Sequence, residues 1–185
     1  MANPWDPFPL PTRGDEDKNS TFQGVGFATS QWEFLEFRLS RLYSVFVDQA
    51  DSLDAIRTYG AGRIFKDRLV LLKNAANQHF VRHPAQRTEV IFERLVVALL
   101  GFADRRNEVA HGVVYPAFKI DGRKQYALIP PYHLLRKHNA DGAPTFAYTH
   151  HELELLGYRL LKLSTEVEEY WKALAGPKAT PPIQL

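Results

Sequence analysis

The chain has 185 residues, 45% of them hydrophobic, so we expect one domain with a sizeable core and room for a tail at each end. Its formal net charge of +2 is too small to indicate nucleic-acid binding by itself. The absence of cysteine excludes disulfides, zinc–thiolate sites, iron–sulfur clusters and a cysteine nucleophile, and it fits the reducing cytoplasm, where we expect the protein to act. The sequence has neither a secretion signal nor a membrane-spanning apolar run, so no membrane association is expected.

Both ends of the sequence are rich in proline and are expected to lack regular structure. Residues 1–24 contain several prolines, a charged patch and Gly24, which together predict a flexible arm. Three side chains are expected to hold this arm against a surface, namely Trp5, Phe8 and Leu10. Residues 176–185 are interpreted as a flexible tail. The helical domain is therefore expected to span residues 25–175.

The first expected helix starts at Ser30. Ser30 and Glu33 have the spacing of a capping box, in which both side chains satisfy free backbone N–H groups. Apolar residues at helical spacing then continue to about Ala50. A second helix is expected over about 62–80, with an inward-facing set made of Ile64, Leu69, Leu72, Ala76 and Phe80.

The third expected helix, over about 84–111, is the most apolar segment of the chain. Its middle, residues 91–103, is apolar on nearly every side, which predicts a central helix buried among others. The last expected helix covers about 150–174 and begins at a second capping box formed by Thr149 and Glu152.

A β-hairpin is expected between the third and the last helix, over about 113–130. Asp121 and Gly122 stand between two runs of strand-forming residues, and this dipeptide is a strong signal for a tight hairpin turn. Together these patterns predict an all-α fold, an up-and-down four-helix bundle with a small β-hairpin inserted before its last helix.

The candidate site directly follows the most buried stretch, at the end of the third helix. In a helix, Asn107 and His111 are one turn apart and share a face, so the asparagine amide is expected to bind the imidazole and fix its tautomer. Arg106 lies about 100° round the helix from Asn107. Arginine and histidine therefore converge only if the last turn loosens near Gly112, or if a second copy completes the site across a dimer.

These residue types suit phosphodiester cleavage without a metal ion. The imidazole of His111 is able to act as general base on a ribose 2′-hydroxyl or as general acid on the leaving oxygen. The guanidinium of Arg106 stays charged and binds phosphate through two hydrogen bonds, so it stabilises charge that develops on the phosphate oxygens.

The segment Arg106-Asn107-x-x-x-His111 resembles the R-x4-6-H signature of HEPN domains, and the string from Arg106 to Gly112 looks like the R-N-x-x-A-H-G version found in many bacterial proteins. The resemblance implies a bundle of four or five helices that forms a homodimer, with the two motifs facing one cleft. It also implies metal-independent endoribonuclease activity without a cofactor, often in toxins or phage defence. By the same resemblance, Arg106 and His111 are catalytic and Asn107 supports them.

Two other interpretations of the motif stay open. The chain is alternatively a non-catalytic interaction or RNA-binding protein of the same fold, such as one member of a toxin–antitoxin or nucleotidyltransferase pair. In the second alternative the protein is a helical scaffold, and the motif only caps a helix, because basic side chains near a helix C-terminus interact favourably with its last carbonyl groups.

A second basic region gives candidate RNA-binding residues. Arg63, Lys66 and Lys73 lie in or near the second expected helix, and Arg105 lies beside the motif. An ordinary solvated helix face explains the first three equally well.

No metal site is expected. His79 and His83 have the i, i+4 spacing of a metal-binding pair, but no well-placed carboxylate accompanies them in the sequence. Dimerisation is expected through the first and third helices near the motif, because Phe34 and Phe37 supply more aromatic surface than a core needs.

Overall fold

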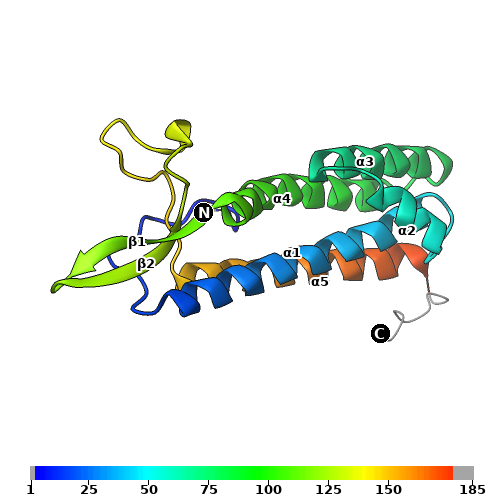
Figure 1. Cartoon of the computed structure of the whole chain (residues 1–185). Helices are drawn as coiled ribbons and strands as arrows, with labels where there is room; N and C mark the ends of the chain where they lie inside the picture. Colours follow the sequence, from blue (N-terminus) through cyan, green and yellow to red (C-terminus); the bar gives the residue numbers. More distant parts are fainter. Residues whose placement is uncertain (1–2, 177–185) are drawn as a thin grey trace. The chain divides into compact units, whose positions relative to one another are not determined.

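The computed structural model describes residues 3–176. Within this part the chain is mostly helical, and a two-stranded antiparallel hairpin precedes the last helix, as predicted (Figure 1). Its elements are α1 (Lys18–Phe46), α2 (Leu53–Gly60), α3 (Phe65–Arg82), α4 (Gln86–His111), β1 (Val113–Ile120), β2 (Arg123–Ile129), the 3-10 helix η1 (Leu135–Lys137) and α5 (His150–Ala175). None of the helices among the described residues has the length and apolar character needed to cross a bilayer.

The chain forms two compact units. The first contains Met1–Glu33 and Ala98–Leu161, and the second contains Phe34–Val97 and Lys162–Leu185. The hairpin and the candidate motif belong to the first unit, whereas α2 and α3 belong to the second. Helices α1, α4 and α5 contribute residues to both units.

Helix α1 begins at Lys18, so the start predicted at Ser30 is wrong. The Asp17 carboxylate accepts a hydrogen bond from the backbone N–H of Asn19 at 3.0 Å and caps the helix earlier. The helix then continues through Gly24, where a side chain would lie 2.8 Å from Leu153 of α5. This close packing explains why a glycine that resembles a helix breaker lies inside a helix, and the last residues of the predicted arm 1–24 are therefore helical.

The residues before α1 pack onto the first unit through aromatic side chains. Trp5 lies edge-on to Phe102 with ring centroids 6.1 Å apart, and Phe8 lies edge-on to Tyr148 at 6.0 Å. The expectation that Trp5 and Phe8 hold this segment is confirmed, whereas Leu10 is exposed and takes no part.

The predicted hairpin turn is confirmed. Asp121 and Gly122 have φ values of 49° and 78°, the left-handed conformation that the tightest hairpin turns require at both central residues. The strands pair antiparallel from Val113 opposite Ile129 to Ile120 opposite Arg123, with an irregularity in β1.

Strand β2 has hydrogen-bonded neighbours beyond β1. Asp15 and Tyr126 exchange two backbone hydrogen bonds of 2.8 Å, and Leu128 and Tyr148 exchange two of 2.8 and 2.9 Å. The Asp15 carboxylate also accepts hydrogen bonds from the Thr21 hydroxyl at 2.6 Å and from the backbone N–H of His150 at 2.8 Å. Asp15 therefore connects the N-terminal segment, α1, the hairpin and the start of α5.

In the second unit, aromatic rings from three helices form much of the core. Phe46 of α1 contacts Phe80 of α3 and Phe92 of α4 edge-on, with centroids 5.8 and 5.2 Å apart. The second expected helix corresponds to α3, and its predicted inward residues are buried except Ile64, which is exposed because it precedes the helix as its N-cap. The short helix α2 was not predicted; the Ser52 hydroxyl caps it by accepting a hydrogen bond from the N–H of Ala55.

Helix α4 is buried on one side only, so the prediction that it is surrounded by other helices is wrong for this chain. Its buried side carries Phe92, Leu95, Val96, Leu99 and Phe102. Large apolar side chains are nevertheless exposed along the same helix, at Val90, Ile91, Val97 and Leu100. On α1, Phe34 and Phe37 are likewise exposed.

Helix α5 begins as predicted. The backbone N–H of Thr149 donates to the Glu152 carboxylate at 2.8 Å, which is one half of a capping box. The helix ends before Gly176, which adopts a φ of 70° and donates its N–H to the Lys172 carbonyl. Apart from Gly176, the predicted tail 176–185 lies outside the described residues.

Candidate functional site

The candidate motif occupies the last two turns of α4, which remains helical up to His111. Asn107 and His111 are exposed, and Arg106 is partly buried. In a regular helix, residues five apart lie about 140° apart round the axis, so Arg106 and His111 point in different directions. The loosened last turn that would bring them together is not present.

Arg106 is held by neighbouring side chains of the first unit. Its Nη1 atom donates to the Asn107 side-chain oxygen at 3.3 Å, and its guanidinium carbon lies 5.6 Å from the centroid of the Trp32 ring. Its Nη2 atom lies 4.0 Å from the Glu33 carboxylate. The Asn107 oxygen thus orients the arginine, whereas the sequence predicted a bond from Asn107 to His111.

Arg105 is part of a largely buried ion pair. Its Nη1 atom lies 3.0 Å from the Glu108 carboxylate, and the two side chains are only 12% and 11% exposed. The Tyr148 hydroxyl donates a hydrogen bond to the same carboxylate, and burial together with this bond raises the pKa of Tyr148. The tentative assignment of Arg105 as an RNA contact is therefore not favoured, because its charge is already paired inside the protein.

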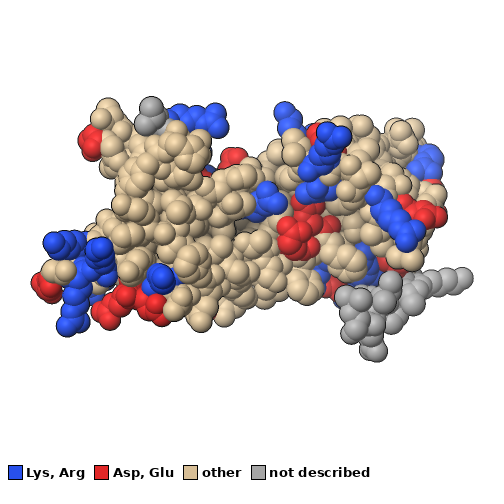
Figure 2. Space-filling model, viewed as in Figure 1, with Lys and Arg blue, Asp and Glu red and all other residues tan. Residues whose placement is uncertain are grey.

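The structure also reveals a basic hairpin that the sequence analysis did not single out. Lys119, Arg123 and Lys124 are exposed beside the turn, and Figure 2 shows blue side chains gathered at the left end of the view, where the hairpin lies. Lys119 and Lys124 stand directly opposite each other across the strands. Like charges in this position destabilise a hairpin, so its own stability does not explain them.

Exposed aromatic rings lie in the same unit as the basic hairpin. Tyr115 of β1 and Tyr132 are both exposed, and their rings contact edge-on with centroids 5.3 Å apart. Tyr132 also stacks on His138 at 5.4 Å. Exposed cations together with exposed aromatic rings are typical of surfaces that bind single-stranded nucleic acid. The basic residues and tyrosines of 115–138 were a signal present in the sequence.

The other tentative RNA-binding residues lie in the second unit. Arg63, Lys66 and Lys73 are all exposed. Arg68 between them is not available, because its Nη2 and Nε atoms bind the Glu36 carboxylate at 2.6 and 3.1 Å. This region therefore offers three exposed cations, not a continuous basic row.

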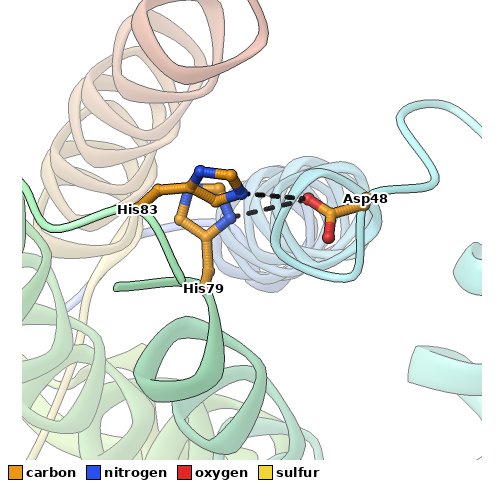
Figure 3. A group of neighbouring side chains, drawn as sticks. All are labelled: Asp48, His79 and His83. Atoms are coloured by element: carbon orange, nitrogen blue, oxygen red, sulfur yellow. Dashed lines mark ion pairs between the residues drawn. The ribbon is translucent and has the colours of Figure 1, made fainter. Parts of the chain in front are cut away.

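The second unit also contains a cluster of two histidines and one carboxylate (Figure 3). Asp48 follows the end of α1, His79 belongs to α3, and His83 is the residue after α3. Burial, and next the neighbouring His83, lower the pKa of His79, which favours its neutral ring. This cluster is not visible in the sequence, because Asp48 is far from the histidines along the chain and only the packing of α1 against α3 brings it close.

No protein-family model matches the chain, and neither a curated protein nor a solved structure is significantly similar to it.

Proposed function

We propose that the protein is a dimeric, HEPN-like, metal-independent endoribonuclease built on an up-and-down helical bundle, with Arg106, Asn107 and His111 at its site. One observation carries the proposal. The last turns of α4 hold an exposed histidine and an arginine that neighbouring side chains orient, and they belong to the same unit as the basic hairpin and the Tyr115–Tyr132 pair. The first group offers the chemistry, and the second offers a surface for single-stranded RNA.

In the proposed reaction, His111 removes the proton from a ribose 2′-hydroxyl, and the resulting oxygen attacks the adjacent phosphorus. The bond from phosphorus to the 5′-oxygen then breaks, that oxygen takes up a proton from water, and the His111 imidazolium returns the proton it removed to the solvent. Arg106 stabilises the negative charge that builds on the non-bridging oxygens. The products are a 2′,3′-cyclic phosphate and a free 5′-hydroxyl, so DNA, which lacks the nucleophile, is not cut.

A dimer is part of the proposal because one chain does not bring Arg106 and His111 together. Successive spacings of three and four residues put Val97, Leu100, Asn107 and His111 on one side of α4. Val97 and Leu100 expose apolar surface on that side. A second copy that covers this side would bring its own His111 toward the first, and a dimer is the arrangement that the sequence suggested.

The runner-up function is a non-catalytic RNA-binding protein of the same fold, with an antitoxin or nucleotidyltransferase as partner. The basic hairpin and its tyrosines favour this candidate, because they would bind RNA whether or not the motif is active. In the scaffold alternative, the motif only caps α4 and RNA is not bound.

The deciding experiment measures RNA cleavage in EDTA for the wild type, His111→Ala and Arg106→Ala, with melting temperature recorded for each. We expect a loss of about 10²–10⁴-fold for His111→Ala and a comparable loss for Arg106→Ala, with melting nearly unchanged because both side chains are at least partly exposed. The exposed His151 is the control, and His151→Gln should retain full activity. If the wild type binds RNA without cleaving it, the protein is the non-catalytic RNA-binding protein. If it neither binds nor cleaves RNA, the scaffold alternative holds.

A further inference from the structure

Asp48, His79 and His83 direct their ligand atoms toward one another. The Asp48 Oδ1 atom lies 3.9 Å from His79 Nδ1 and 4.0 Å from His83 Nε2, and the three ligand atoms all lie within 4.8 Å of one another (Figure 3). These are ligand atoms that zinc and similar divalent transition metals prefer.

The three ligand atoms lie slightly farther apart than the ligand atoms around a bound zinc ion do. Ligand atoms on a tetrahedral zinc ion lie about 3.3 Å apart, given metal–ligand bonds of about 2.0–2.1 Å. The carboxylate and each imidazole thus need to approach by about 0.6–0.7 Å, and the two imidazole nitrogens by up to about 1.5 Å, a movement within reach of side-chain rotation. The side chains of His83 and Asp48 are 60% and 47% exposed, so solvent reaches both and a water molecule is able to complete the coordination.

The backbone of Asp48 places its carboxylate at the C-terminus of α1. Asp48 has a φ of 58°, the left-handed conformation that commonly ends a helix, and its N–H donates to the Val45 carbonyl at 3.0 Å while that of Gln49 donates to the Ser44 carbonyl at 2.8 Å. The side chain that this conformation presents is the carboxylate facing both imidazoles.

An unsatisfied polar atom lies in the same cluster. The Nδ1 atom of His79 is shielded from solvent and has no hydrogen-bond partner among the described residues. Its ring packs against Phe46 and Phe80, which fixes its position. A buried nitrogen without a partner is costly, and a bound cation would satisfy it.

Arg82 is the group that competes with a cation. It forms a close ion pair with Oδ2 of Asp48, and its Nη2 atom donates to the Phe46 carbonyl at 3.1 Å. The atom that faces the histidines is Oδ1, so the carboxylate is able to bind the arginine and a metal at once. In that arrangement Arg82 orients the ligand, as groups around metal-bound carboxylates commonly do.

We propose that Asp48, His79 and His83 form a binding site for one divalent transition-metal ion of the zinc class, with water as a further ligand. The ion would link the end of α1 to the end of α3 and so close the intervening loop and α2. Its role is structural stabilisation of the second unit, separate from the metal-independent chemistry proposed at His111.

The test uses the full chain, freed of metal with EDTA and then of EDTA, and titrated with zinc against a chromophoric chelator. We expect one zinc ion per chain and a melting temperature that rises with zinc concentration, because a ligand of the native state alone stabilises it. Cobalt should occupy the site in place of zinc and give the visible absorption of a low-coordinate complex.

Variants decide whether this cluster is the site. His83→Gln removes an exposed ligand and should weaken zinc binding at least about 100-fold, as even groups behind the ligands contribute about 10–100-fold. Asp48→Asn, which keeps a residue tolerated at positive φ, should also abolish the zinc-dependent rise in melting temperature. His151→Gln should bind zinc as the wild type does. Absence of saturable zinc uptake, or uptake unchanged in His83→Gln, would overturn the proposal and leave an Asp48–Arg82 ion pair.

Discussion

Arg105 and Glu108 lie one turn apart in α4, with Nη1 of the arginine 3.0 Å from the carboxylate. The next residue, Arg106, points about 100° away round the helix and belongs to the proposed site. Two adjacent arginines thus have separate surroundings: the first pairs with the carboxylate that binds Tyr148, and the second is the residue that we propose to bind phosphate.

Replacing Glu108 with glutamine should destabilise the protein. The amide is still able to accept a hydrogen bond from Tyr148, but the Arg105 charge then remains largely buried without its partner. We expect the free energy of unfolding to fall by about 1–3 kcal/mol, measured by urea denaturation. The exposed Asp104 on the same helix is the control, since Asp104→Asn should change stability by less than about 0.5 kcal/mol. Equal effects of the two changes would contradict the structural role of the ion pair.

Removing the charges of the hairpin should weaken RNA binding and its salt dependence. Each lost phosphate contact reduces the slope of log K against log salt by about 0.7 for a single strand, so the slope should fall by about 2 in the triple variant Lys119→Gln, Arg123→Gln and Lys124→Gln.

A second triple variant, at Arg63, Lys66 and Lys73, serves as the comparison. Both sets remove three exposed cations, so net charge alone predicts equal effects. A larger loss of RNA affinity in the second triple variant would indicate that RNA binds at α3 and not at the hairpin.

Glu168 should stabilise the protein at neutral pH but not in acid. Its carboxylate lies 2.6 Å from Arg38 and 3.0 Å from Lys172, and the hydrogen bond from Lys172, with both positive charges, lowers its pKa from the ordinary value of 4.5. The folded state therefore holds the ionised form more strongly than the unfolded chain does. This stabilisation is complete above pH 4.5 and disappears as the pH falls through the lowered folded-state pKa.

Glu168→Gln should accordingly reduce the free energy of unfolding by about 1 kcal/mol at neutral pH and by little in acid. Denaturation curves of both proteins across this pH range measure the difference. A cost that stays constant with pH would mean that packing, and not charge, accounts for the effect of the substitution.

Gly101→Ala should have opposite effects in two backgrounds. A side-chain carbon there would lie 2.2–2.6 Å from atoms of the Trp5 ring, so the tryptophan must move and lose its contact with Phe102. We expect a net destabilisation of about 1–2 kcal/mol in the wild type. In the Trp5→Ala background the same change should stabilise by up to about 1 kcal/mol, because alanine favours a helix over glycine. Thermal melting of the four proteins measures both effects, and a uniform sign would exclude packing of Trp5 on Gly101.

The sequence predicted elements where a local signal dominates. The hairpin followed from Asp121 and Gly122, whose conformation the turn demands, and the start of α5 followed from Thr149 and Glu152. The start of α1 did not follow from the sequence, because Asp17 supplies the cap in a segment whose prolines and glycines favour irregular structure.

The candidate site was predictable only in part. The motif at Arg106 and His111 is contiguous, so it is visible in the sequence. The cluster of Asp48 with His79 depends on tertiary packing, and so does the Arg105–Glu108 pair with Tyr148. The pairing of Lys119 with Lys124 was predictable, because a two-residue turn at Asp121 and Gly122 sets the register of the two strands.

Asp15 has a consequence for the order in which the chain folds. Its carboxylate binds the backbone of His150, a partner 135 residues away, whereas the hairpin and the helices form from contacts between near neighbours. Contacts that close such long loops form late, since the entropy lost in closing them is large. During synthesis the N-terminal segment precedes its partners and reaches its full set of contacts only after Tyr126 and His150 have both been made. The edge of β2 at Tyr126 is open until Asp15 pairs with it, and such an edge is prone to pair with another chain, so docking of the N-terminal segment protects the protein from association.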